Sequence, residues 1–453
     1  MIPHPSRKRR RLLATVVLAA VATSGILAAG EFPTVSFEKY DLPNGLRVIL
    51  SVDRSAPVVA TFVHYHVGSK NERPDRTGFA HFFEHLMFEA TENIPRKKLD
   101  EILQTAGARR NASTTEDQTY YWLNLPANQL ELALWIESER MLHAKVEEIG
   151  VETQRGVVKE EKKQRLDNQP YSSFNEYLHA NLAAGTPYAW LPIGSAQYID
   201  QATIDEFREF YNTYYVPNNA VLVIVGDIDI AATKKFIDKY FSDIPRGREI
   251  ARPTISLGLG TAEKVIEVRE DKTPLPGLVY GYRTVGRGHP DAYALNLLSR
   301  VLAVGNSSRM YRHLVDEKRV ALEAAAFLTE REQTGFFKML ALAYPTTSLE
   351  QLGAAMEEEI AAIQKNGVTD REFRKALNQV RTEYAQQYSD VLQKAQELAF
   401  YEVMQGDANL INTEFDRYLK LTPEDLRRVA KNYLVPTNRV VLKYIPPVKE
   451  GGR

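Results

Sequence analysis

The feature that most constrains the fold of this chain is an internal repeat. Residues 203–223 and 422–442 match at a constant offset of 219 positions. In each copy a threonine is placed to cap an amphipathic helix, a Val-Pro-x-Asn turn follows, and a β-branched run comes next. Each copy is therefore predicted to be one helix–turn–strand unit, used once in each half of the chain.

The beginnings of the two halves also correspond. Strands are predicted at 58–67 and 277–282, and each leads through a polar loop into a predicted helix, near 78–88 and 292–302. The simplest interpretation is a duplicated α+β fold, in which each half is a mostly antiparallel sheet with helices packed on one face. Further strands are predicted at 47–52 and 220–225, and long amphipathic helices at 349–365 and 370–387.

The duplication sets the expected domain boundaries. A chain of 453 residues has room for two domains of about 200 residues each. We predict an N-terminal domain at 31–245, which carries the candidate site, a linker at 246–260 and a homologous C-terminal domain at 261–453. Pro, Gly and Arg cluster in the linker, between segments with clear hydrophobic periodicity.

The first 30 residues are typical of a signal peptide. A basic stretch, 7–11, precedes an apolar run, 12–29, which ends in small residues suited to cleavage. An uncleaved anchor is the alternative, because the run is at the lower limit of membrane-spanning length, but its Ala, Thr and Gly content favours cleavage. The arginines fit both general and twin-arginine export. Either way the body is expected outside the cytoplasm, most naturally in a bacterial periplasm.

Charge and cysteine content exclude several classes of function. The chain has 57 Lys and Arg against 58 Asp and Glu, so no overall field attracts nucleic acid or an anionic membrane surface. Cysteine is absent, which excludes disulfides, thiol nucleophiles and thiolate metal sites. Any metal ion must therefore be bound by His, Asp or Glu.

One motif carries clear chemistry. His81 and His85 lie four residues apart on the helix predicted near 78–88, so both imidazoles project from one face at a spacing that chelates a metal. Glu84 projects beside that face, where it could take a proton from a metal-bound water without being a ligand. This order, His-x-x-Glu-His, is found in zinc peptidases. The alternative is two helix histidines satisfied by hydrogen bonds in the core.

Two histidines are too few for a catalytic zinc site, which normally has three protein ligands. His64 and His66 share one face of a predicted strand, but we interpret them as outward polar residues of a half-buried strand. The third ligand must then be another His or an acid. The charged segment 152–167 offers several acids, and spacing alone does not choose among them.

Three segments together resemble the pitrilysin/insulinase family of inverted-motif zinc metallopeptidases. They are 78–88, Arg-Gly-Val-Val-Lys-Glu-Glu at 155–161 and Asp-Asn-Gln-Pro-Tyr at 167–171. The resemblance implies a zinc-dependent endopeptidase with one Zn²⁺ per chain. It assigns the metal to His81, His85 and Glu161, with Glu160 as second choice, and the catalytic role to Glu84.

The resemblance also implies how a substrate binds. Asn111 and Ala112 would lie on an exposed edge strand, to which a peptide adds as a further strand; an ordinary hairpin is the alternative. Such a site selects extended, unfolded or small peptides. Gln154 stands where relatives often have a glutamate that supports the metal site, so this support is expected to lack a charge here.

The second half departs from the family pattern. It has no His-x-x-Glu-His, and no Arg and Tyr lie seven residues apart around 312–326, where many relatives have a pair that contacts the substrate. The resemblance therefore implies a zinc-bearing subunit whose homologous partner supplies the Arg/Tyr pair in a heterodimer. A homodimer is possible, Arg309, Tyr311 and Arg312 are weaker substitutes within the chain, and a non-catalytic peptide-binding or scaffold subunit is the alternative function.

Overall fold

The structure is a computed structural model that describes residues 32–447. The predicted signal peptide lies outside the described residues, so its cleavage stays a prediction. Residues 35–447 form one compact unit. Among the described residues, no helix is both long enough and apolar enough to cross a membrane.

The first half of the unit forms a six-stranded sheet, sheet 1. Its strands are β1 (Glu38–Asp41), β2 (Arg47–Val52), β3 (Val58–Tyr65), β4 (Arg109–Thr114), β5 (Thr119–Pro126) and β6 (Ala220–Gly226). Their spatial order is β1-β2-β6-β3-β5-β4, in which β2 and β6 are parallel and all other neighbours antiparallel. Strand β4 is therefore an edge strand, with one side unpaired within the sheet.

The second half forms a five-stranded sheet, sheet 2. Its strands are β7 (Lys264–Arg269), β8 (Gly277–Val285), β9 (Ala321–Glu330), β10 (Thr334–Ala343) and β11 (Arg439–Ile445). The order β7-β11-β8-β10-β9, with only β7 and β11 parallel, repeats the order β2-β6-β3-β5-β4 of sheet 1. The predicted duplicated α+β architecture is confirmed.

The repeated sequence units form the same local structure twice. Thr203 caps α7 (Ile204–Tyr214) through a capping box with Glu206, and Thr422 forms the equivalent box for α15 (Pro423–Tyr433). After each helix comes a short 3₁₀ turn that begins at a proline. The side-chain amide of Asn219 donates to the Tyr214 carbonyl at 2.7 Å, and Asn438 makes the matching bond at 2.9 Å. The repeated residues thus make the same local hydrogen bonds in both halves, which explains why the helix–turn–strand unit could be predicted from the sequence.

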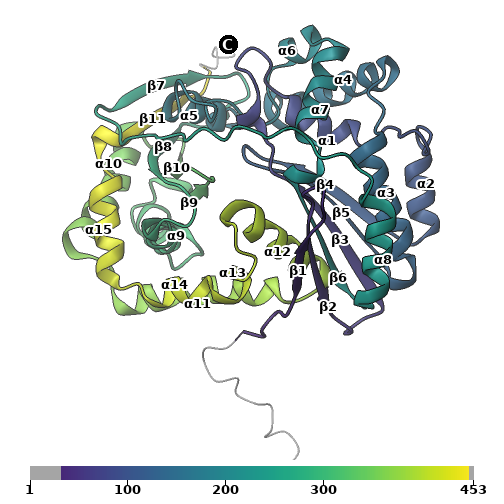
Figure 1. Ribbon diagram of the computed structural model, residues 1–453. Coiled ribbons are helices and arrows are strands. Elements are labelled where there is room, and N and C mark those ends of the chain that lie inside the picture. Colours follow the sequence, from purple (N-terminus) through teal and green to yellow (C-terminus); the bar gives the residue numbers. More distant parts are fainter. Residues whose placement is uncertain (1–31, 448–453) are drawn as a thin grey trace, which may run out of the picture. The chain divides into compact units, whose positions relative to one another are not determined.

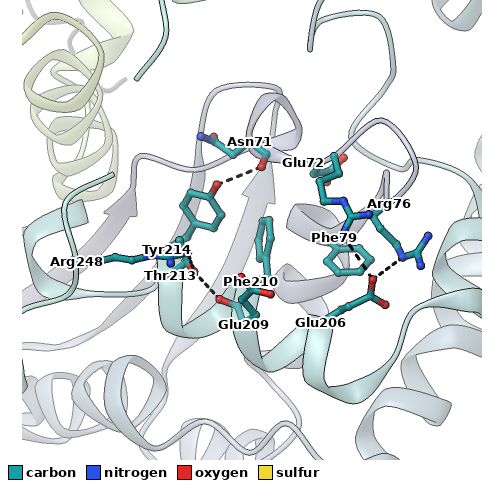
Figure 2. A pocket seen from close by; sticks show the side chains of 11 residues that line it. Asn71, Glu72, Arg76, Phe79, Glu206, Glu209, Phe210, Thr213, Tyr214 and Arg248 are labelled. Atoms are coloured by element: carbon teal, nitrogen blue, oxygen red, sulfur yellow. Dashed lines mark hydrogen bonds and ion pairs between the residues drawn. The ribbon is translucent and has the colours of Figure 1, made fainter. Parts of the chain in front are cut away.

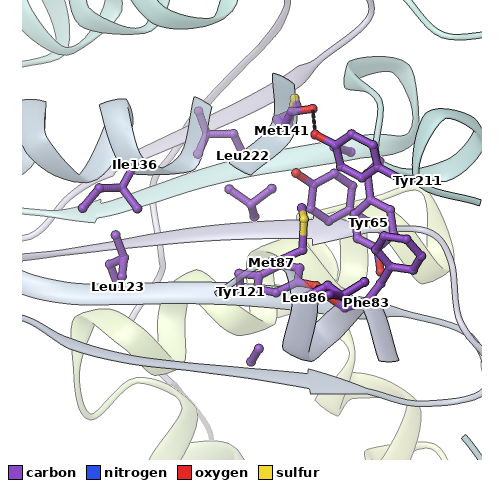
Figure 3. Close-up of a cluster of buried hydrophobic side chains, with 14 of the residues drawn as sticks. Tyr65, Phe83, Leu86, Met87, Tyr121, Leu123, Ile136, Met141, Tyr211 and Leu222 are labelled. Atoms are coloured by element: carbon purple, nitrogen blue, oxygen red, sulfur yellow. Dashed lines mark hydrogen bonds between the residues drawn. The ribbon is translucent and has the colours of Figure 1, made fainter. Parts of the chain in front are cut away.

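Helices from the first half cover one face of sheet 1. They are α1 (Phe79–Leu86), α3 (Leu130–His143), α7 and α8 (Ile230–Phe241). Figure 3 shows part of this core, where the ring of Phe83 packs among tyrosines and the Tyr211 hydroxyl donates to the Met141 carbonyl at 2.8 Å. The Tyr121 hydroxyl also donates to the Phe83 carbonyl at 3.1 Å, which ties α1 to β5. The helix that carries the candidate site is thereby fixed against a rigid sheet.

The opposite face of each sheet is covered by a helix from the other half. Helix α12 (Val391–Gln405) packs on β3 and β6 (Figure 1), where its apolar residues meet Phe62 and Val223. Helix α5 (Phe174–Leu182) packs in the same way on β8 and β11, through Leu178 and Leu182. The sequence predicted helices on one face of each sheet; the structure confirms these and adds this reciprocal exchange.

Among the remaining elements, the helices predicted at 292–302, 349–365 and 370–387 are found within two residues of those bounds. Residues 247–260, within the predicted linker, contain neither helix nor strand. The other helices are η1 (Ser69–Asn71), α2 (Lys98–Thr105), η2 (Ala127–Gln129), α4 (Glu148–Lys162), the π-helix η3 (Lys163–Asp167), α6 (Ala196–Gln201), η4 (Pro217–Asn219), α9 (Pro290–Ala303), the π-helix η5 (Tyr311–Glu317), α10 (Leu349–Asn366), α11 (Asp370–Gln387), α13 (Leu410–Thr413), α14 (Phe415–Leu419) and η6 (Pro436–Asn438).

A buried ionic cluster joins the hairpin turns of the two sheets. Asp117, in the β4–β5 turn, accepts from the backbone N–H of Glu332, in the β9–β10 turn, at 2.9 Å. Lys70 pairs with both carboxylates, at 2.8 Å for Asp117, and His66 Nε2 lies 2.8 Å from Glu332. Because most of these groups are buried, they hold the two turns at a defined separation.

Candidate metal centre

Helix α1 positions the predicted motif through its amphipathic pattern. Phe79, Phe82, Phe83 and Leu86 are buried against sheet 1 and α7, at the spacing of one helix face. The residue just before the helix is Gly78, whose φ of 104° lies in the left-handed region that favours glycine. His81, Glu84 and His85 are therefore left to the other side of the helix.

A buried glutamate caps the start of α1. The Glu72 carboxylate accepts hydrogen bonds from the backbone N–H groups of Gly78 and Ala80, at 2.9 and 2.8 Å. It also accepts from Trp190 Nε1 at 3.0 Å, and burial raises its pKa to about 8. The sequence analysis missed Glu72, because a capping residue seven positions before the helix has no distinctive spacing. Its role is to fix where the helix begins.

The cavity beside this cap is separate from the motif. It has a volume of about 190 Å³, and none of His81, His85 and Glu161 lines it. Figure 2 shows its wall, where Arg76 pairs with Glu206 at 2.8 Å. On the other side the Tyr214 hydroxyl donates to the Asn71 carbonyl at 3.2 Å, as Figure 2 also shows. These contacts brace the N-terminal end of α1 rather than the face that carries His81 and His85.

Helix α4 brings the third predicted residue to the motif. It packs against α1, with Val151 and Val158 buried between them and the rest of the core. The guanidinium of Arg155 is buried and donates to the carbonyl oxygens of Ala202, at 2.6 Å, and Ile199. These contacts fix the rotation of α4, so that Glu161 faces α1.

The three predicted ligand atoms converge. Glu161 Oε2 lies 3.2 Å from His85 Nε2 and 3.6 Å from His81 Nε2. Among the described residues, these three form the one group of His and acidic side chains whose ligand atoms all lie within 4.8 Å of one another. Both histidines use the same ring nitrogen, which the spacing of four residues on one helix allows.

The donor set fits a zinc ion. Zinc–ligand bonds of about 2.0–2.1 Å in tetrahedral geometry place neighbouring ligand atoms about 3.4 Å apart. The two distances to Glu161 Oε2 bracket that value. Two imidazole nitrogens and one carboxylate oxygen are also a ligand set of catalytic zinc sites, which keep the fourth position open.

Burial and neighbouring charges set the protonation of these groups. Burial, together with His85, lowers the pKa of His81 to about 4, so its imidazole is neutral at pH 7. The hydrogen bond with His85 lowers the pKa of Glu161, whereas burial raises the pKa of Glu84. His81 Nδ1 is buried and makes no hydrogen bond with the described residues.

Glu84 lies between the converged group and the edge of sheet 1. Hydrogen bonding from Thr114, the last residue of β4, and the charge of His85 both act on its carboxylate. Asn111 is exposed and Ala112 is buried on the same strand, whose outer edge is unpaired. The structure therefore places the predicted base beside the strand that was predicted to bind the substrate.

The side chains near Glu161 on α4 and η3 differ in where they point. Glu160 points elsewhere and accepts from Gln164 Nε2 at 3.0 Å. Arg165, in the π-helix η3, lies 2.8 Å from the other carboxylate oxygen of Glu161 and was missed by the sequence analysis. Gln154 donates to Glu89 at 2.5 Å and makes no hydrogen bond with the three converged residues. Any support from Gln154 would act through Glu89.

The two strand histidines do not join this group, as predicted, but the reason given for them was wrong. His66 and His64 are 7% and 1% exposed, so neither is an outward polar residue. His66 belongs to the ionic cluster with Glu332, while neither ring nitrogen of His64 makes a hydrogen bond of normal geometry with the described residues. The sequence analysis did not foresee that α12 covers this face of sheet 1.

The arginines considered in the second half have partners there. Arg309 donates to Glu372 at 2.7 Å, and Arg312 lies 3.3 Å from Glu317. No hydrogen bond or ion pair joins either arginine to the converged group among the described residues. Their side chains are thus engaged within the C-terminal half.

Comparison with known proteins identifies the family. Residues 47–190 match the family described as Insulinase (Peptidase family M16), and residues 201–380 match the description Peptidase M16 inactive domain. This chain belongs to peptidase family M16. The resemblance noted in the sequence is therefore confirmed; the first matched region lies within the first half, and the second begins there, at residue 201, and extends into the second half.

Relatives within family M16 cover nearly the whole chain. Zinc protease PqqE of Helicobacter pylori is 29% identical over 437 residues, which cover 96% of this chain and 98% of that protein. A crystal structure of a protease from Helicobacter pylori has a TM-score of 0.86 at 28% identity and covers 91% of this chain and 100% of that one. The first half of the periplasmic protease PqqL from Escherichia coli shares the fold, with a TM-score of 0.74 at 20% identity, covering 92% of this chain and 94% of that one.

Proposed function

We propose that this chain is a zinc-dependent endopeptidase that hydrolyses extended or unfolded peptides, with one Zn²⁺ held by His81, His85 and Glu161. The observation that carries the proposal is the convergence of their three ligand atoms beside Glu84 and the edge strand β4. A metal site, a general base and a peptide-binding edge are the three elements that such a reaction needs.

Each residue of the proposed site then has a defined task. Zinc bound at this site supplies a Lewis acid that polarises a carbonyl and makes water a stronger nucleophile at neutral pH. Glu84 accepts the proton of the attacking water and passes it to the nitrogen of the leaving amine. Strand β4 holds the substrate backbone extended past Glu84, and Arg165 holds the second oxygen of Glu161.

The proposal includes a homologous partner subunit. The region 312–326 lacks the Arg/Tyr pair that the family resemblance leads one to expect, and Arg309 and Arg312 are engaged with acids of their own half. A second, homologous chain that supplies this pair in a heterodimer explains both observations. A homodimer is the alternative assembly.

The competing function is a non-catalytic peptide-binding or scaffold subunit. The description of the second matched region as an inactive domain is compatible with it. The complete His-x-x-Glu-His motif and the converged Glu161 favour a catalytic subunit, because a scaffold has no use for a metal-binding geometry. We also propose export, most naturally to a bacterial periplasm, from the N-terminal sequence; the Escherichia coli structural neighbour is described as periplasmic.

Zinc analysis and a peptidase assay test the proposal together. The chain without residues 1–30 is purified, its zinc content measured, and a quenched unstructured peptide offered with and without a chelator. Turnover that the chelator abolishes and zinc restores supports a self-sufficient peptidase and refutes the need for a partner. One equivalent of zinc without turnover supports a subunit that needs its partner, and absence of zinc binding favours the scaffold function.

A further inference from the structure

A buried group of basic side chains lies between α5 and sheet 2, apart from the proposed active site. On α5, Asn175 and His179 are one turn apart and face β10. On β10, Phe336 and Lys338 are two residues apart, so they point to the same side of the sheet. Arg331, in the β9–β10 turn, lies over the Phe336 ring, with its guanidinium carbon 4.6 Å from the ring centre. Arg331 and Lys338 therefore both lie in the layer between α5 and sheet 2.

Both cations are removed from water. The exposed fraction is 3% for Arg331 and for Lys338, and 1% for His179. Burial and the charge of Arg331 together lower the pKa of Lys338 to about 7, although the charge of Glu116 opposes this. A lysine pKa this far below the usual value of 10.5 indicates that the described side chains compensate the buried ammonium incompletely.

One carboxylate faces this pair of cations. Glu116, in the β4–β5 turn of the first half, lies 2.8 Å from Arg331. The neighbouring acids of the two hairpin turns, Asp117 and Glu332, are already engaged in the ionic cluster with Lys70. Among the described residues, no ion pair joins the β10 lysine to an acid, and its hydrogen bond goes to a neutral amide. Two buried cations thus share one carboxylate, which is a local excess of positive charge.

Several N–H groups of the two cations have no acceptor among the described residues. Arg331 Nη2 donates to Glu116 and lies 2.7 Å from His179 Nε2, but Nε and Nη1 of the same guanidinium are buried and make no hydrogen bond there. The Lys338 ammonium has three N–H groups, and it makes one hydrogen bond, to Asn175 Oδ1 at 2.6 Å. Buried donors normally find a partner, and those of charged groups are the most costly to leave unpaired. The partner that these donors require is an acceptor, and the charge excess favours a negative one.

The surroundings of the unpaired donors suit a small ion. Lys338 Nζ lies 5.8 Å from the ring centre of Phe174 and 5.7 Å from that of Phe327. These two rings and Asn175 are only partly buried, so an ion can pass them from solvent. The nearly complete burial of Arg331 and Lys338 excludes a bulky organic ligand that would contact both.

We infer that Arg331 and Lys338 together bind a small inorganic anion of the class of chloride. The anion accepts hydrogen bonds from Nε or Nη1 of Arg331 and from the Lys338 ammonium, and it balances the second cation. Glu116 belongs to the first half of the chain, whereas the two cations belong to the second. The ion therefore stabilises the junction at which the two halves meet. The inference depends neither on the zinc site nor on the proposed reaction.

Bromide, a heavier ion of the same class, locates the site. Crystals of the chain are grown with sodium bromide, and diffraction is measured at the bromine absorption edge. We expect an anomalous peak within hydrogen-bonding distance of Lys338 Nζ and of a guanidinium nitrogen of Arg331. Crystals of the Lys338→Met variant under the same conditions should lack this peak. Absence of the peak from the unmodified chain would overturn the inference.

Thermal unfolding measures the same binding in solution. Chloride replaces the bulkier methanesulfonate at constant ionic strength, over a range of about 1 to 100 mM. The pH is held at 6, below the pKa of Lys338, so that the amine is protonated. Because the ion binds the folded chain, Tm should rise by about 2 °C for each tenfold increase in chloride above Kd.

Three variants define the outcome. The rise of Tm with chloride should disappear in Lys338→Met, persist in Lys338→Arg and stay unchanged in Lys264→Met, which alters an exposed lysine of β7. The unfolding transition itself shows that each variant is folded, and the dependence on chloride does not rely on the variants having equal stability. No rise in the unmodified chain, or an equal rise in Lys338→Met, would overturn the inference. A bromide peak without a rise in Tm would overturn it too, as binding at crystal concentration only.

Discussion

His85 Nε2 and Glu161 Oε2 lie 3.2 Å apart, although the two residues are 76 positions apart in the chain. The contact depends on the packing of α4 on α1 and on the buried Arg155, which fixes the rotation of α4. Glu160, one residue earlier, is turned away and bonded to Gln164. Two adjacent acids on one helix thus differ completely in what they can bind.

This difference predicts the metal content of two matched variants. Glu161→Gln replaces an anionic ligand by a neutral amide, and zinc affinity should fall about a hundredfold or more. Glu160→Gln changes the same charge one residue away and should keep one equivalent of zinc. Both are measured by competition with a chromophoric chelator. Equal zinc affinity in the two variants would remove Glu161 from the ligand set.

Replacement of the proposed base should separate metal binding from turnover. Glu84→Gln keeps the size of the side chain but cannot accept a proton, so kcat should fall about 10²- to 10⁴-fold. Zinc content and peptide affinity should stay unchanged, because Glu84 is not one of the three converged residues. Zinc analysis, anisotropy and single-turnover kinetics provide the three readouts. Turnover equal to that of the unmodified chain would show that another group takes the proton.

Much of the fold was predictable because its signals are local. The capping boxes at Thr203 and Thr422, the Val-Pro-x-Asn turns and the alternating strands need only neighbouring residues to form. The exchange of α5 and α12 between the halves was not predictable. An apolar helix face shows that it is buried, but nothing in its periodicity tells which sheet it covers. His64 was misinterpreted for the same reason.

The residues of the candidate site also fall into those that the sequence predicts and those that it does not. His81 and His85 follow from helical spacing, whereas Glu161 required the family resemblance, because several acids on α4 fit equally well. Arg165 stands four residues after Glu161, the ordinary spacing of a helical ion pair, so it could have been predicted once Glu161 was assigned. Glu72 reaches α1 from a preceding turn, so its role depends on how the chain folds back.

Backbone methylation of the substrate tests the proposed strand addition to β4. An added strand exchanges hydrogen bonds with its neighbour through every second residue. N-methyl groups introduced one at a time along a cleaved peptide should therefore raise KM about tenfold at alternate positions and little at those between. Steady-state kinetics on such a series gives the register directly. Uniform tolerance of N-methylation would show that the peptide does not pair with the edge.

The ionic cluster between the two hairpin turns predicts a pH-dependent stability. Burial raises the pKa of Glu332, but His66 and Lys70 outweigh this and lower it to about 2. Because the folded pKa lies below the ordinary value of 4.5, the carboxylate stabilises the fold above about pH 4.5. That contribution is lost as the pH falls toward 2.

Glu332→Gln should therefore reduce the free energy of unfolding by about 3 kcal/mol at pH 7, since it removes the carboxylate that pairs with the buried Lys70 and His66. The difference from the unmodified chain should shrink between pH 4.5 and 2, where Glu332 becomes protonated and loses its charge. Glu323→Gln, an exposed residue of β9, serves as the matched control and should change stability little at any pH. Urea unfolding at several pH values measures both. A difference that stays constant down to pH 2 would mean that Glu332 acts through packing and not through its charge.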